Sequence, residues 1–180
     1  MKIISNTLSN SILISIIVFF IKFMTTLNKK FLIIIIIIII SFIINCLLKQ
    51  LSKNIVQINN LKLLRNIILR PLSYKCTRNN LFYLPSFFGI QTSNIGLPSG
   101  HSQIIWTIII SCLLFFNLTK TSKIILILMG ILVSISRLGI FPILGVKCHT
   151  TLQVILGGFI GAFIGLFISN IFKNMLFRSI

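Results

Sequence analysis

Long stretches without a charged residue constrain the fold of this chain more than any other feature. Nineteen uncharged residues separate Lys2 from Lys22, and 18 separate Lys30 from Lys49. Three more apolar stretches lie at 99–119, 124–136 and 150–172. A membrane-spanning helix needs about 20 apolar residues, and none of these segments carries the polar stripe of a soluble surface helix. The sequence therefore predicts an all-α, polytopic transmembrane helix bundle of about five spans.

The 180 residues suggest one domain, 1–180, whose motif-bearing core covers about 45–172. The first apolar segment fits either a retained helix or a cleaved signal peptide. We favour the retained helix, because no small-x-small cleavage site follows it. The isoleucine run 33–40 is expected to form lipid-facing surface.

The chain has 17 Lys and Arg residues, two His, and no Asp or Glu, giving a formal charge of +17. Without acids it has no carboxylate to act as general acid, nucleophile or ligand for a hard cation. Its four cysteines are far apart and are expected to be small hydrophobic residues, not zinc ligands. The basic residues flank apolar segments, which favours a lipid bilayer and not nucleic acid as the partner.

Crossing parity brings the unusual polar residues to one face of the membrane. With two crossings before residue 49 and three after residue 97, the polar stretch between them lies on the same face as three later groups. These groups are the turn at Pro98, the end of the fourth segment at Arg137, and the start of the fifth at His149. Arg70-Pro71 belongs to the polar stretch. We therefore expect an active site at one membrane face.

Each of these groups suits an anion. Pro98-Ser99-Gly100-His101 opens a helix, whose free N–H groups and positive dipole end attract phosphate. Arg137 lies only 14 residues after Lys123, about 20 Å of helix, which places it inside the membrane profile unless it snorkels to the interface.

His149 opens the fifth segment, and Gln153 lies four residues later on the same helical face. The Gln153 carbonyl can accept the Nδ1–H of His149 and leave Nε2 free as a nucleophile. Gln153 is therefore the predicted nucleophile-orienting residue.

In this order the residues resemble the type-2 phosphatidic acid phosphatase superfamily, whose pattern is Lys, Arg-Pro, PSGH, then Ser-Arg and His. The matching positions here are Arg70-Pro71, 98–101, Ser136-Arg137 and His149. Within the superfamily the dolichyl-diphosphatase branch looks most similar, through 96–103 with Trp106 and through the residues that follow His149.

The resemblance implies a metal-independent, cofactor-free phosphohydrolase that forms a phosphohistidine. It makes His149 the nucleophile and His101 the acid that protonates the leaving oxygen. It assigns phosphate binding to five positions: Lys62, Arg70, Ser99, Gly100 and Arg137. The implied substrate is a polyprenyl or dolichyl diphosphate in an endoplasmic reticulum-like membrane. Alternatives are a phosphatidate or lysolipid phosphatase and an inactive homologue that binds anionic headgroups.

Three departures from the family pattern bear on the site. Seven residues separate Lys62 from Arg70, where the family has six; Lys49 also fits the family's lysine, and Lys62 is slightly preferred. Eleven residues separate Arg137 from His149, where the family usually has five, so this insertion must loop out. Gln153 replaces the usual Asp. Membrane orientation stays open, because basic residues divide about equally between the two faces once those of the site are set aside.

Overall fold

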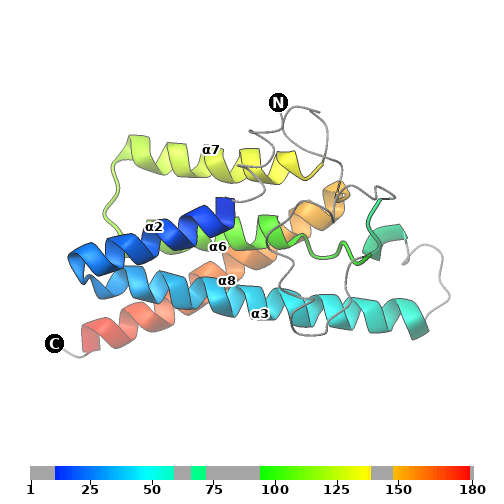
Figure 1. Ribbon diagram of the computed structural model, residues 1–180, viewed down its shortest axis with the longest axis horizontal. Helices are drawn as coiled ribbons and strands as arrows, with labels where there is room; N and C mark the ends of the chain where they lie inside the picture. Colours follow the sequence, from blue (N-terminus) through cyan, green and yellow to red (C-terminus); the bar gives the residue numbers. More distant parts are fainter. Residues whose placement is uncertain (1–10, 59–65, 72–93, 139–147, 179–180) are drawn as a thin grey trace.

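The structure is a computed structural model that describes residues 11–58, 66–71, 94–138 and 148–178. The described residues form helices, with one isolated bridge and no strand. Each of the five predicted apolar segments contains a helix, so the all-helical prediction is confirmed. The helices are α2 (Ser11–Thr26), α3 (Lys29–Ile58), α6 (Gly100–Phe115), α7 (Lys120–Ser136) and α8 (Thr151–Arg178) (Figure 1).

Two of the described helices are long and apolar enough to cross a bilayer, namely α3 over Lys29–Gln57 and α8 over Thr151–Met175. The other three are shorter, with 16 residues in α2, 16 in α6 and 17 in α7. At 1.5 Å per residue they measure about 24–26 Å, against a hydrocarbon core of about 30 Å. Length and composition thus give two candidate spans.

The outward faces of the helices are apolar. Large hydrophobic side chains are exposed on all the described helices except α6, with Phe159 and Phe163 of α8 at 72% and 68%. The helix bundle therefore presents to its surroundings the kind of side chain that a water-soluble bundle buries.

The expectation for the isoleucine run is wrong for half of its residues. Ile33, Ile34, Ile37 and Ile38 are buried and pack against α6, whereas Ile39 is exposed. An apolar run has no polar stripe that marks its inner face, and neighbouring helices fill that face as readily as lipid does.

A seam of small residues joins α6 to α8. A Cβ added to Gly157 would meet the Ser99 backbone, one at Gly161 would overlap the Gln103 carbonyl oxygen, and one at Gly165 would lie 2.9 Å from the Thr107 carbonyl oxygen. Four residues further along both helices, Ser169 Oγ donates a hydrogen bond to Ser111 Oγ at 2.9 Å. The contacts advance by four residues on both helices in the same direction. The two helices therefore run parallel and begin at the same end of the molecule.

Buried polar side chains tie α3 to this seam. Gln103 accepts a hydrogen bond at 2.8 Å from Asn45 Nδ2 and donates one from Nε2 to the Ser41 carbonyl, also at 2.8 Å. Thr107 Oγ1 lies 2.9 Å from Ser41 Oγ and 3.0 Å from the Gly161 carbonyl oxygen. These hydrogen bonds fix the register of α3 against α6, because any slip would leave buried polar groups unpaired.

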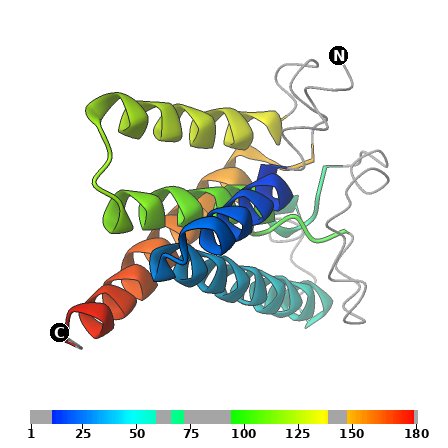
Figure 2. The same cartoon turned by 60° about the vertical axis from the view of Figure 1, so that its left-hand side comes forward.

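Helix α7 lies at the edge of the bundle beside α6 in both views (Figures 1 and 2). Its N-cap is Thr119, whose Oγ1 accepts the Ser122 N–H at 3.2 Å. Its last residues return the chain to the end where α6 and α8 begin (Figure 1).

The seam predicts that Gly161→Ala destabilises the protein, because the new Cβ overlaps the Gln103 backbone and must push α6 from α8. An overpacked contact of this kind costs about 1–3 kcal/mol. Thermal unfolding in detergent should show a lower midpoint for Gly161→Ala than for Asn170→Ala, a control at an exposed position on α8. Equal midpoints for the two variants would contradict the seam.

Candidate functional site

A short backbone pairing places Arg70 beside the start of α6. Leu69 and Ile95 form an antiparallel bridge, and the Arg70 N–H donates to the Asn94 carbonyl at 2.9 Å. The Arg70 Nε also donates to the Ile95 carbonyl, at 3.2 Å. Arg70 and the Pro98 turn therefore lie at one end of the molecule, as crossing parity predicted.

The start of α6 is held against α8. The Ser99 N–H donates to the Gln153 carbonyl at 3.1 Å, and the first helical hydrogen bond runs from the Gln103 N–H to the Ser99 carbonyl at 3.0 Å. A Cβ on Gly100 would lie 3.0 Å from Asn45 Oδ1, so the glycine allows α3 to approach this turn.

Two hydroxyl groups near this helix start have no partner among the residues that the structure describes. Ser99 and Ser102 are fully buried, and neither Oγ makes a hydrogen bond in the described part of the chain. Ser99 precedes the helix but does not cap it with its side chain. A buried hydroxyl without a partner is costly, so either group would gain from a hydrogen bond to a polar ligand that reached the first turn. Sequence reasoning missed Ser102, although it lies three residues after Ser99.

Arg137 and His149 lie next to each other despite the 11 residues between them. The Arg137 carbonyl accepts the backbone N–H groups of Cys148 and His149, each at 3.1 Å. The residues on either side of the insertion are therefore close together. Residues 139–147 lie outside the described ranges, so the loop itself stays a prediction. Arg137 is 4% exposed, and its Nε has no hydrogen-bond partner among the described residues.

The hydrogen bonds of His149 determine its tautomer. Its Nδ1 lies 2.9 Å from the Gly96 carbonyl oxygen and 3.2 Å from Gln153 Oε1. The Gly96 carbonyl can only accept, so Nδ1 carries the proton and donates. In the neutral ring Nε2 then keeps its lone pair. The interaction with Gln153 is as predicted; the Gly96 carbonyl was not foreseen.

The amide of Gln153 is itself held in one orientation. Its Nε2 donates to the carbonyls of Ile67 and Leu69, both at 2.8 Å. This leaves Oε1 facing His149 and the Thr150 N–H, which lies 3.2 Å away. Gln153 is fully buried, so one side chain couples the segment that carries Arg70 to the imidazole.

The surroundings of His149 lower its pKa well below 6.5. Burial is the largest cause, followed by the positive charges of Arg70, Lys49 and Arg137 and the nearby His101. Burial and the charge of Arg70 also lower the pKa of Arg137, to about 10, so this guanidinium stays protonated at neutral pH. His149 is thus a neutral base among cations.

Lys49 belongs to this group of cations. It lies on α3, is 7% exposed, and acts electrostatically on His149. Lys62 falls outside the described residues, so the preference for Lys62 as the phosphate-binding lysine stays a prediction. Lys49 is the lysine that the described structure brings to the site.

The cysteines do not all behave as small hydrophobic residues. Cys46 and Cys112 are free and buried, as expected, but Cys148 is disulfide-bonded. Cys76 lies outside the described residues. In the ranges that the structure describes, no three His, Cys, Asp or Glu side chains are close enough together to hold a metal ion.

The arrangement can therefore bind and attack an anion. Arg70, Arg137 and Lys49 supply charge, α6 supplies the positive end of its dipole, and His149 Nε2 supplies a lone pair. The chain has no Asp or Glu to neutralise these cations. Comparison with protein-family models, curated proteins and solved structures finds no match for the chain.

The lowered pKa predicts that His149 stays neutral as the pH falls through 6.5. Nitrogen-15 NMR of histidine-labelled protein should show a neutral, Nδ1-protonated ring for His149 at pH 6. The unfolded chain takes up this proton near pH 6.5 and the folded chain does not, so unfolding free energy should fall with acidification below that pH.

Comparison with His149→Asn isolates this contribution to the pH dependence of the unfolding midpoint, because the variant keeps all other titrating groups. The wild type should lose more stability than His149→Asn between pH 7 and pH 5. Imidazolium signals from His149 at pH 7 would contradict the assignment.

Proposed function

We propose that the protein is a metal-independent membrane phosphatase of the type-2 phosphatidic acid phosphatase kind, acting on a lipid phosphate or diphosphate. The observation that supports this most is the state of His149, whose Nδ1–H is bound by Gly96 and Gln153 and whose neutral ring therefore carries its lone pair on Nε2, among Arg70, Lys49 and Arg137. Phosphoryl transfer needs little beyond positioning and charge stabilisation, which these groups can supply.

In the proposed reaction, the Nε2 lone pair of His149 attacks the terminal phosphorus. The bond from phosphorus to the leaving oxygen breaks, and His101 donates a proton to that oxygen. A water molecule then transfers a proton to His101 and attacks the phosphohistidine, which releases inorganic phosphate and restores Nε2. Ser99, Gly100, Arg70, Arg137 and one lysine hold the phosphoryl oxygens.

The membrane arrangement is part of the proposal. We infer that all five described helices cross the bilayer, because α2, α3, α7 and α8 expose large apolar side chains and α6 packs among them. Disulfides persist in oxidising compartments. The disulfide of Cys148, next to His149, therefore favours the lumenal face of an endoplasmic reticulum-like membrane for the site.

A polyprenyl diphosphate is the preferred substrate, and phosphatidate or a lysolipid phosphate is the alternative. Purified protein in detergent should release phosphate from a long-chain isoprenoid diphosphate in the presence of EDTA. His149→Ala should reduce the rate to background, because no other described side chain offers a free imidazole nitrogen in the same place. If His149→Ala hydrolysed the substrate at the wild-type rate, a phosphohistidine at His149 would be excluded. A panel of lipid phosphates ranks the substrates.

A protein that only binds anionic headgroups would use the same cations. It would bind inorganic phosphate with an affinity that falls as salt rises, and it would hydrolyse no phosphate ester. Turnover by the wild type in EDTA separates the two functions, since a binding protein releases no phosphate from any member of the panel.

The burial of Lys49 beside His149 predicts that it is the phosphate-binding lysine. Lys49→Met should lower kcat/KM by about 10²–10³-fold, the usual effect of removing one group that stabilises transition-state charge. Lys53→Met is the matched control, one turn further along α3, and should stay within about twofold of the wild type. Loss of activity in Lys62→Met with normal activity in Lys49→Met would return the role to Lys62.

A further inference from the structure

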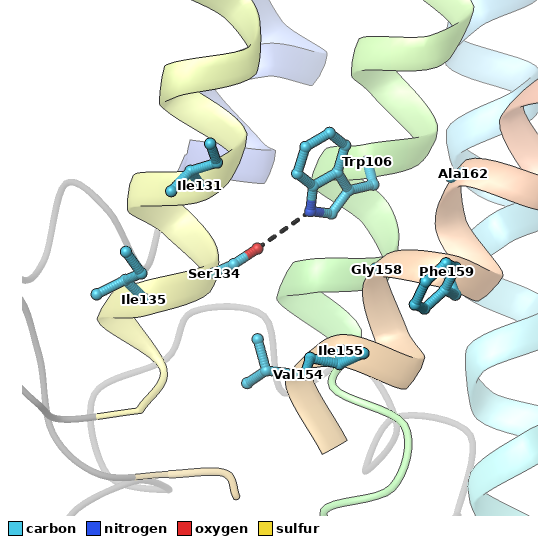
Figure 3. Close-up of a pocket in the computed structure, with 9 residues that line it drawn as sticks. All are labelled: Trp106, Ile131, Ser134, Ile135, Val154, Ile155, Gly158, Phe159 and Ala162. Carbon is cyan, nitrogen blue, oxygen red and sulfur yellow. Dashed lines mark hydrogen bonds between the residues drawn. The ribbon is translucent and has the colours of Figure 1, made fainter. Parts of the chain in front are cut away.

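An apolar groove lies between α7 and α8 (Figure 3). Its volume is about 360 Å³. Ile131 and Ile135 of α7 form one wall, and Val154 and Phe159 of α8 form the other, with Trp106 of α6 between them. Apart from Ser134 and Gly158, every residue that lines the groove has a hydrophobic or aromatic side chain.

Two residues that line the groove lie close along the chain to residues of the site. Val154 follows Gln153, which holds His149, and Ile135 lies two residues before Arg137. The end of the groove that holds Val154 and Ile135 therefore lies at the same end of α7 and α8 as Arg137 and His149.

Trp106 is held in place within the groove. Its Nε1–H donates to Ser134 Oγ at 3.2 Å, so the one polar side chain of the groove is already paired (Figure 3). A Cβ on Gly158 would lie 3.2 Å from Trp106 Cδ1, and one on Gly130 would lie 3.4 Å from Cζ2. The indole therefore fits between a glycine of α8 and a glycine of α7.

We propose that this groove binds the apolar chain of the lipid phosphate substrate and that Trp106 determines which chains fit. The proposal rests on the proposed function and adds the site of the chain. A bilayer is as apolar as the groove, so transfer into it gains little hydrophobic free energy. The groove acts instead by shape, fixing the chain so that the phosphate stays at His149.

The fluorescence of Trp106 tests the proposal without turnover, because Trp106 is the only tryptophan of the chain. His149→Ala protein is placed in phosphatidylcholine vesicles that contain phosphatidate with brominated chains, and then in vesicles with brominated phosphatidylcholine instead. Quenching by the phosphatidate should saturate at a mole fraction about tenfold lower than that for phosphatidylcholine. Equal quenching by both lipids would show an ordinary lipid-facing surface and overturn the proposal.

Chain selectivity gives a second test. Ala162 lines the groove, and Ala162→Phe fills it. The ratio of kcat/KM for a long-chain over a short-chain lipid phosphate should fall by about tenfold or more in this variant. Leu166→Phe adds an aromatic ring at an exposed position on the same helix and should leave the ratio unchanged.

The two proposals fail in different ways. Selective quenching in a protein that hydrolyses no phosphate ester would support the groove and overturn the phosphatase function. Hydrolysis in EDTA together with equal quenching and an unchanged ratio in Ala162→Phe would overturn the groove and leave the phosphatase function in place.

Discussion

Close parallel packing of α6 against α8 is the constraint on which the rest of the structure depends. Glycines on α8 meet the α6 backbone every four residues, at Gly157, Gly161 and Gly165. Because the helices run parallel, their N-terminal ends lie together, and the Ser99 N–H reaches the Gln153 carbonyl. The site lies at this junction: one helix start brings Ser99 and His101, and the other brings His149. Bulkier residues in the seam would separate the two starts.

The second determinant is charge that the chain itself cannot neutralise. Arg70, Arg137 and Lys49 act on one buried imidazole, and the chain contains no Asp or Glu. Repulsion among buried cations costs free energy, which a bound anion recovers. The same repulsion keeps His149 neutral, and a neutral imidazole is the form that attacks phosphorus. Affinity for an anion and readiness of the nucleophile therefore share one electrostatic cause.

The sequence predicted the convergence of the site because successive antiparallel helices begin at alternate ends of a bundle, and this needs only the order of apolar segments. Arg70, the Pro98 turn, Arg137 and His149 were brought together in this way. The contact between His149 and Gln153 was also predictable, since residues four apart share a helical face.

Features that depend on a partner helix were not predictable. The isoleucine run shows no inner face, so the burial of Ile34 and Ile37 required knowledge of where α6 lies. The sequence offered both Lys49 and Lys62 and could not choose between them, because the choice depends on α3 continuing as one helix of 30 residues to Ile58. The tautomer of His149 is fixed by the backbone carbonyl of Gly96. Every residue has a backbone carbonyl, so the sequence could not indicate which one would lie against His149.

Orthovanadate, a mimic of phosphoryl transfer, tests the central claim most directly. A crystal or cryo-electron microscopy structure of the wild-type protein with orthovanadate should show the vanadium bonded to His149 Nε2. Its oxygens should lie within hydrogen-bond distance of Arg70, Arg137 and the first turn of α6. A structure in which vanadate is bound elsewhere, or in which Nε2 of His149 is the nitrogen bound to the Gly96 carbonyl, would contradict the account.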